Sequence, residues 1–282
     1  MHDNGGVPMA FAAARTMLST GFGVLTSHRA LRAFPARSSV IAAVVMGVPM
    51  LLVGADVTDG TSATPWLLAG AAYLLTMIVT TFGNAALIAQ TDIVLRGGYP
   101  SAAAGRRAAR ARWAAILLWA LAAATVLPVL RLVEHDWRDM RAMRGRTRTA
   151  WADVANLALP KIVLEHRNPI DALRDSRAAL ERGWGADVAS SARLGIVGYI
   201  LVLVGIVLSV SVGAALGAQA QAGTGLPYGA AVGGWLGLSV FTTALIFVSA
   251  ATAVYQTALY RYSVDGRTPP AFAADLTRSF QP

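Results

Sequence analysis

Four long apolar runs, almost free of charged residues, dominate the pattern of this chain. They occupy residues 38–55, 65–95, 194–217 and 229–260. A helix needs roughly 20 apolar residues to cross a bilayer core of about 30 Å, and these runs suit that length. A transmembrane barrel would instead show alternating segments of about ten residues, which are absent. The pattern therefore predicts an all-α, polytopic transmembrane helical bundle with four strong spans.

Two weaker apolar runs leave the number of crossings open. Residues 113–130 and 150–164 would bring the total to about six membrane helices. The second run contains Asp153 and Asn156, and Pro160 interrupts it. If the first run only dips into the membrane and returns, the chain crosses four times instead of six.

Two segments separate an apolar from a charged helical face, which is typical of helices lying in the membrane interface. The first is an amphipathic helix in residues 9–37, and we expect Phe34-Pro35 to end it, because helical geometry is disfavoured before proline. The second begins at Asn168-Pro169, and its apolar face should turn toward lipid or the bundle. A plain connecting helix packed on the bundle is the alternative for both segments. The apolar face of the second consists of Ile170, Leu173, Leu180 and Trp184.

These elements predict a disordered start, residues 1–8, followed by a single membrane domain, residues 9–282. The domain begins with the amphipathic helix and ends in a cytoplasmic tail. In chain order, the predicted parts of the domain are the amphipathic helix 9–37, a first membrane half 38–130, a basic and amphipathic connecting region 131–193, a second membrane half 194–262 and the cytoplasmic tail 263–282.

The composition supports a membrane protein. Of the 282 residues, 55% are hydrophobic and 14% charged, whereas a soluble domain carries about a quarter charged residues. The net charge is +9. In a soluble protein this charge would suggest nucleic acid, but here the arginines lie beside apolar runs and no nucleic-acid motif accompanies them. The lack of cysteine excludes disulfides, thiol catalysis and cysteine metal sites.

The distribution of basic residues predicts the topology. The loop 97–112 carries four arginines and no acid, and we expect these arginines to contact anionic lipid headgroups in the cytoplasm. The loop 218–228 is uncharged and expected outside, while the tail after Arg261 is basic. The sequence thus predicts a multi-pass protein of the cell membrane with both termini cytoplasmic. The four arginines are Arg106, Arg107, Arg110 and Arg112.

Candidate chemistry is sparse. No acid, lysine or histidine lies near the middle of a strong span, where ion-coupled transporters place such groups. Asn84 is expected to bond another helix rather than a substrate. The pairs Glu134-His135 and Glu165-His166 make no metal site alone, because adjacent residues point in different directions on a helix. We therefore predict no catalytic, cofactor-binding or metal-binding residues and no cofactor.

Small residues recur at every fourth position along the last two spans. This spacing lines a groove that lets another backbone approach closely. We expect the two spans to pack on each other, with self-association between protomers as the alternative. The residues are Gly205, Ser209, Gly213 and Gly217 in one span and Gly229, Gly233 and Gly237 in the next.

Several residue strings, taken in order, resemble an uncharacterised prokaryotic family of polytopic membrane proteins, the domain of unknown function 6159. The resemblance implies a bundle of about six membrane helices and no known reaction, cofactor or site. Asp153 and Asn156 depart from its pattern, because apolar residues are expected there. The strings are Phe34-Pro35, Phe82 to Leu87, Pro160 with Leu164-Glu165, Pro169 with Ala172-Leu173 and Ser176, Trp184-Gly185, Ala258 to Tyr262, Gly266, Pro270 and Phe280.

Three functional hypotheses follow from these observations. The first is a non-enzymatic membrane protein that acts in envelope organisation or as a lipid- or partner-associated subunit. The second is a transporter of small molecules or lipids, with a polar path near Asn84 and the Pro160 break. The third, a membrane enzyme acting on lipids, would need ionisable side chains that converge in a pocket.

Overall fold

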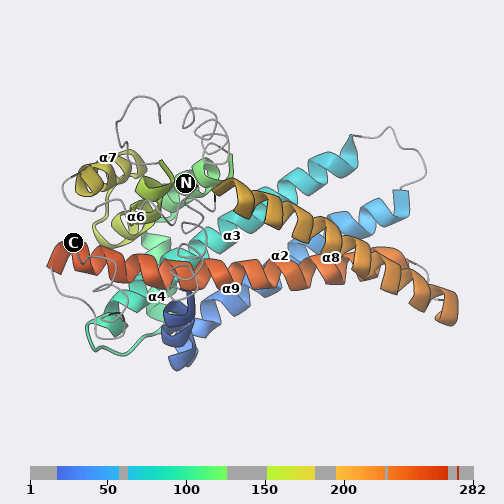
Figure 1. Cartoon of the computed structure of the whole chain (residues 1–282), viewed down its shortest axis with the longest axis horizontal. Helices are drawn as coiled ribbons and strands as arrows, with labels where there is room; N and C mark the ends of the chain where they lie inside the picture. The colour runs from blue at the N-terminus through green and yellow to red at the C-terminus, as the bar shows by residue number, and fades with distance from the viewer. Residues whose placement is uncertain are drawn as a thin grey trace, which may run out of the picture. The chain divides into compact units, whose positions relative to one another are not determined.

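The computed structural model describes residues 18–56, 63–125, 151–181, 195–225, 228–265 and 272, and Figure 1 traces their helices in chain order. No strand occurs among the described residues, so the all-α prediction is confirmed. The predicted disordered start, residues 1–8, lies outside them. Helices without a label cover residues 18–27 and Trp113–Thr125. The labelled helices are α2 (Arg29–Asp56), α3 (Thr64–Leu95), α4 (Ala102–Ala111), α6 (Trp151–Leu164), α7 (Pro169–Glu181), α8 (Gly195–Thr224) and α9 (Gly229–Asp265).

Four helices are long and apolar enough to cross a membrane, and they coincide with the four strong predicted runs. The helix Trp113–Thr125 is apolar but shorter. α6 has 14 residues, which span about 21 Å, less than a bilayer core of about 30 Å. Both of these helices adjoin residues outside the described ranges, so the choice between four and six crossings stays open. The four stretches are Arg29–Pro49, Trp66–Leu95, Leu201–Thr224 and Gly229–Tyr262.

The predicted helix end at Phe34-Pro35 is wrong. α2 runs through both Pro35 and Pro49, and the chain leaves helical geometry earlier, at His28. Proline removes one hydrogen-bond donor and disfavours the preceding helical residue, but it does not forbid a helix. Phe34 is buried in the core of its unit, and this packing offsets the local cost.

The predicted interruption at Pro160 is also wrong. Pro160 lies inside α6, which continues to Leu164. Residues 157–163 are all buried, and all but Lys161 are apolar. Burial of this whole stretch stabilises helical geometry across the proline.

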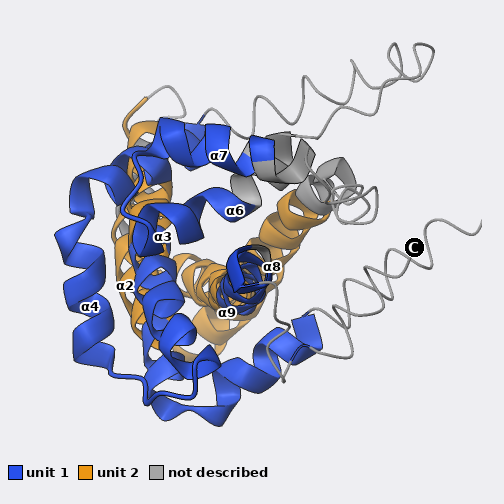
Figure 2. Cartoon of the chain, turned by 90° about the vertical axis from the view of Figure 1, so that its left-hand side faces the viewer, with its two compact units in different colours: residues 1–34, 81–196, 248–282 blue, residues 35–80, 197–247 orange. Residues whose placement is uncertain are grey.

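The chain divides into two compact units, coloured separately in Figure 2. Unit 1 comprises residues 1–34, 81–196 and 248–282, and unit 2 comprises residues 35–80 and 197–247. α3 and α9 each give their first part to unit 2 and their second part to unit 1. The fully buried large side chains belong to unit 1 and include Leu25, Leu31, Leu87, Ile88, Ile116, Ile162, Val254 and Phe272.

In unit 2, α8 and α9 pack through the small residues that recur every four positions. A Cβ built on Gly213 would collide with the backbone of Gly233, and one on Gly237 would collide with the backbone of Ser209. Only residues without a large side chain permit so close an approach. The predicted packing of the two helices on each other within one chain is confirmed.

A second contact in unit 2 joins α2 to α9. The Trp235 indole Nε1 donates a hydrogen bond of 2.8 Å to the carbonyl oxygen of Ala43. A Cβ on Gly47 would come within 2.9 Å of the same nitrogen, so the indole needs the space that this glycine leaves. Tryptophan in an apolar environment requires such a partner for its N–H.

Candidate functional site

The polar side chains of unit 1 gather at two places that together form the candidate site. One is the α6–α7 corner, the four residues from Glu165 to Asn168 between these helices. The other is a buried ion pair between Asp92, near the end of α3, and Arg261, near the end of α9.

Local backbone chemistry explains the α6–α7 corner. His166 has a positive φ of 58°, and the amides of Glu165 and Arg167 both donate to the carbonyl of Lys161, which closes α6. Pro169 then occupies the first position of α7, where a missing N–H costs nothing. The predicted helix start at Asn168-Pro169 is confirmed.

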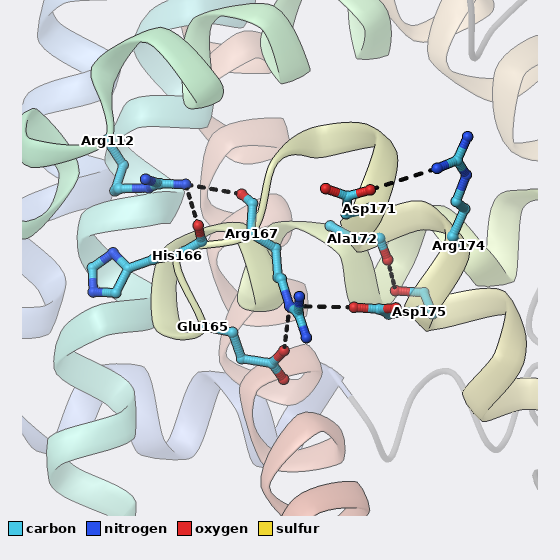
Figure 3. Close-up of polar contacts among 9 residues, drawn as sticks. Arg112, Glu165, His166, Arg167, Asp171, Ala172, Arg174 and Asp175 are labelled. Carbon is cyan, nitrogen blue, oxygen red and sulfur yellow. Dashed lines mark hydrogen bonds and ion pairs between the residues drawn. The ribbon is translucent and has the colours of Figure 1, made fainter.

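Arg112 stabilises the α6–α7 corner through hydrogen bonds to its backbone. It lies in the turn between α4 and the following helix, and its Nη2 donates to the carbonyl oxygens of His166 at 2.5 Å and Arg167 at 3.0 Å (Figure 3). A charged donor makes stronger hydrogen bonds than a neutral one. Sequence reasoning grouped Arg112 with the lipid-contacting arginines and missed this role, because its acceptors are backbone atoms 54 and 55 residues away.

Side chains extend the corner toward α7 and α9. Arg167 Nε lies 3.6 Å from a carboxylate oxygen of Glu165 and 3.3 Å from one of Asp175, as Figure 3 shows. Glu165 is also hydrogen-bonded to the side chain of Tyr260 on α9. Glu165 therefore connects the corner to α9.

The Asp92–Arg261 pair joins α3 to α9. Arg261 Nε donates to Asp92, and both side chains are almost fully buried, at 10% and 11% exposure. Arg96 lies 3.4 Å from Asp92, and Asp265 lies 3.2 Å from Arg261, so two more exposed charges flank the pair. The sequence did not indicate this pair, because its two residues lie 169 positions apart.

Asn84 makes a third contact between α3 and α9. Its side-chain amide donates a hydrogen bond of 2.8 Å to the Ser249 hydroxyl. The prediction that Asn84 bonds another helix is confirmed.

α4 packs on α3 with one face and leaves the other uncovered. The Ser101 amide donates to Gln90 Oε1 at 2.6 Å. A Cβ on Gly105 would lie 2.6 Å from Phe34 and 2.8 Å from the Ala86 carbonyl oxygen. Of the remaining predicted lipid-contacting arginines, Arg106 is half-buried, and Arg107 and Arg110 are exposed.

The face of α7 that packs in unit 1 differs from its predicted apolar face. Ile170 is 61% exposed, whereas Ala172 and Ser176 are fully buried. Small residues let α7 approach closely, and the Ser176 hydroxyl is satisfied by the Ala172 carbonyl at 2.6 Å. The exposed Ile170 is compatible with an apolar face turned toward lipid, which stays a prediction. The side chains of Leu180 and Trp184 lie outside the described residues.

The polar contacts of the candidate site connect the helices of unit 1 to one another. Among the described side chains, no three His, Asp or Glu residues come close enough to hold a metal ion. The acids of the site are bound to arginine: Asp92 to Arg261, and Glu165 and Asp175 to Arg167. Such pairs position helix ends relative to one another within unit 1.

A family model for a family of unknown function, DUF6159, matches residues 66–270. The match covers well over half of the chain. The chain belongs to this family. Neither the search of curated proteins nor the search of solved structures gave a match. Two of the strings that carry the resemblance meet in the structure, because Glu165 bonds Tyr260.

We expect Arg112→Gln to loosen the α6–α7 corner. Loss of two charge-assisted hydrogen bonds should raise amide hydrogen exchange of residues 165–168 about tenfold, or about 1.4 kcal/mol of local opening free energy. Mass-spectrometric hydrogen exchange of the purified protein measures this. Arg110→Gln is the matched control, because Arg110 is exposed on the neighbouring helix and should leave the corner unchanged. Equal exchange in both variants would contradict the role of Arg112.

Proposed function

We propose that this chain is a non-enzymatic integral protein of the cell membrane, acting in envelope organisation or as a lipid- or partner-associated subunit. The observation that carries the proposal is the uncovered apolar surface of the long helices. No residue of Leu201–Thr224 is buried. The large exposed side chains of α8 are Leu201, Leu203, Val204, Val207, Leu208, Val212 and Leu216.

An apolar surface of this kind requires an apolar environment. Soluble monomers rarely expose contiguous apolar patches larger than a few hundred Å². Further exposed side chains on α2 and α3, such as Val44, Val48, Trp66 and Leu67, add to the surface. Hydrocarbon tails supply the matching environment, and this supports a role within the lipid bilayer.

The polar contacts support a non-enzymatic role. Asn84, Asp92, Glu165 and Arg261 are engaged with other helices of unit 1. Buried polar groups with partners fix helix packing, which a structural or associating subunit needs. The transporter alternative would require Asn84 to exchange Ser249 for a substrate.

Anionic lipids are the proposed partners, with no nucleic acid involved. Arg106, Arg107 and Arg110 lie on α4, and no acid occurs between residues 97 and 125. A basic cluster beside a membrane helix attracts anionic headgroups. Native mass spectrometry of the protein extracted with its lipids tests the proposal: co-purified anionic lipid or a protein subunit supports it, and a retained small polar solute favours the transporter.

We expect the two ends of the long helices to be labelled from opposite sides of the cell membrane. The chain lacks cysteine, so single cysteines report directly. Ala222→Cys, near the uncharged loop, should react with a membrane-impermeant maleimide in intact cells. Ala103→Cys, on basic α4, should react only after permeabilisation; both positions are exposed. Labelling of Ala103→Cys in intact cells would reverse the proposed topology.

A further inference from the structure

The uncovered face of α4 combines two arginines with flanking aromatic residues. Arg107 and Arg110 are exposed, and within the described part of the chain no acid pairs with either. Tyr99, just before α4, is 94% exposed, and Trp113, just after it, is 60% exposed. Tyrosine and tryptophan with exposed rings are typical of the membrane–water interface.

The two arginines are placed to share one anion. Residues three apart on a helix are neighbours, with about 5–6 Å between their Cβ atoms. Two like charges at this spacing repel each other unless an anion lies between them. Arginine is suited to this role, because its planar guanidinium forms paired hydrogen bonds with phosphate oxygens.

The helix that follows shows what surrounds this face. In Trp113–Thr125, Leu118 and Leu121 lie three residues apart on an exposed apolar stripe, while Ile116 and Ala120 are buried. An exposed apolar stripe directly after an exposed basic face matches the order of acyl chain and headgroup layers. Figure 2 shows α4 at the edge of unit 1.

We propose that α4 lies in the headgroup layer and that Arg107 and Arg110 together bind the phosphodiester of an anionic phospholipid, with Tyr99 and Trp113 fixing the depth. This proposal depends on the proposed membrane location. It assigns the contact with the anionic headgroup to Arg107 and Arg110. Arg112 is occupied by the α6–α7 corner, and Gly105 and Ala109 form the packed face of α4. An acidic protein partner would need neither the aromatic residues nor the apolar stripe beside the arginines.

Native mass spectrometry of the detergent-solubilised full chain, titrated with dioleoyl-phosphatidylglycerol or dioleoyl-phosphatidylcholine, tests the site. The wild type should bind the first phosphatidylglycerol more tightly than phosphatidylcholine. R107Q/R110Q should weaken phosphatidylglycerol binding by about fivefold or more. Phosphatidylcholine binding should fall less, because its choline already compensates the charge of its phosphodiester. Inorganic phosphate should not compete, because a free anion lacks the acyl chains that the apolar stripe contacts.

Two controls sharpen the result. R107K/R110K keeps both charges and should retain most of the preference, while Arg174→Gln removes an exposed arginine elsewhere in unit 1 and should change nothing. Phosphatidylglycerol affinity of R107Q/R110Q within about twofold of wild type would overturn the site. Vesicle flotation distinguishes failure of the lipid site from failure of the proposed function. A wild-type protein that does not float with vesicles contradicts the membrane location. A wild-type protein that floats without lipid preference contradicts only the site.

Discussion

Gly213→Leu is expected to prevent stable folding of unit 2. The Cβ alone would meet the carbonyl oxygen and carbon of Gly233 and approach the Cα of Gly237. These are backbone atoms, so no side-chain rotation relieves the clash and α8 and α9 must separate. Overpacking by flexible groups costs about 1–3 kcal/mol, and a backbone collision should cost the upper value or more. The thermal midpoint and the monodisperse fraction in detergent measure the loss.

Two controls isolate the packing seam between α8 and α9. Gly70→Leu makes the same change on α3, where a new Cβ would have no neighbour within 4 Å, so we expect no loss of stability. Leu203→Ala trims an exposed side chain of α8 and should cost about 0.5 kcal/mol or less. If Gly213→Leu and Gly70→Leu shift the thermal midpoint equally, the small residues do not form a close contact.

Features with a local periodic signal could be predicted from the sequence. The four long helices follow from apolar length alone, and the seam between α8 and α9 follows from glycines spaced four apart. Neither inference needs the position of a distant residue. The start of α7 at Pro169 was equally accessible, because capping depends on adjacent residues.

Features set by distant contacts could not be predicted. The buried partner of Asp92, Arg261, lies 169 residues away in the chain. The helix end predicted at Pro35 was wrong because burial of Phe34 overrides a local preference. The packed face of α7 was not predicted for a related reason: it uses the small residues Ala172 and Ser176, whereas a hydrophobic pattern selects large ones.

The Asp92–Arg261 pair leads to the second large prediction. Removing one partner of a buried ion pair costs about 3–5 kcal/mol, because the other charge is left uncompensated. Here Arg96 remains near Asp92 and Asp265 remains near Arg261, so each single change should fall toward the lower value. Arg261→Met should lower the free energy of unfolding less than Asp92→Leu does only if Arg96 moves toward Asp92 and compensates its charge. Arg96 is mostly exposed in the structure.

A double-mutant cycle separates the pair from its surroundings. Asp92→Leu and Arg261→Met together leave neither charge buried, and apolar replacements of a buried pair are often neutral or stabilising. We therefore expect the double variant to be more stable than either single variant, with a coupling energy above about 1 kcal/mol. Unfolding by sodium dodecyl sulfate in detergent micelles gives the free energies.

The matched control is the Asp171–Arg174 pair on α7, which has the same chemistry but side-chain exposures of 47% and 77%. Exposed pairs contribute about 0–1 kcal/mol, so its single and double variants should stay within that range. If the Asp92–Arg261 cycle gives a coupling as small as this control, the pair does not hold α3 to α9. The ends of these helices would then be fixed by apolar packing around Leu87, Ile88 and Val254, and the charged groups would be dispensable for the fold.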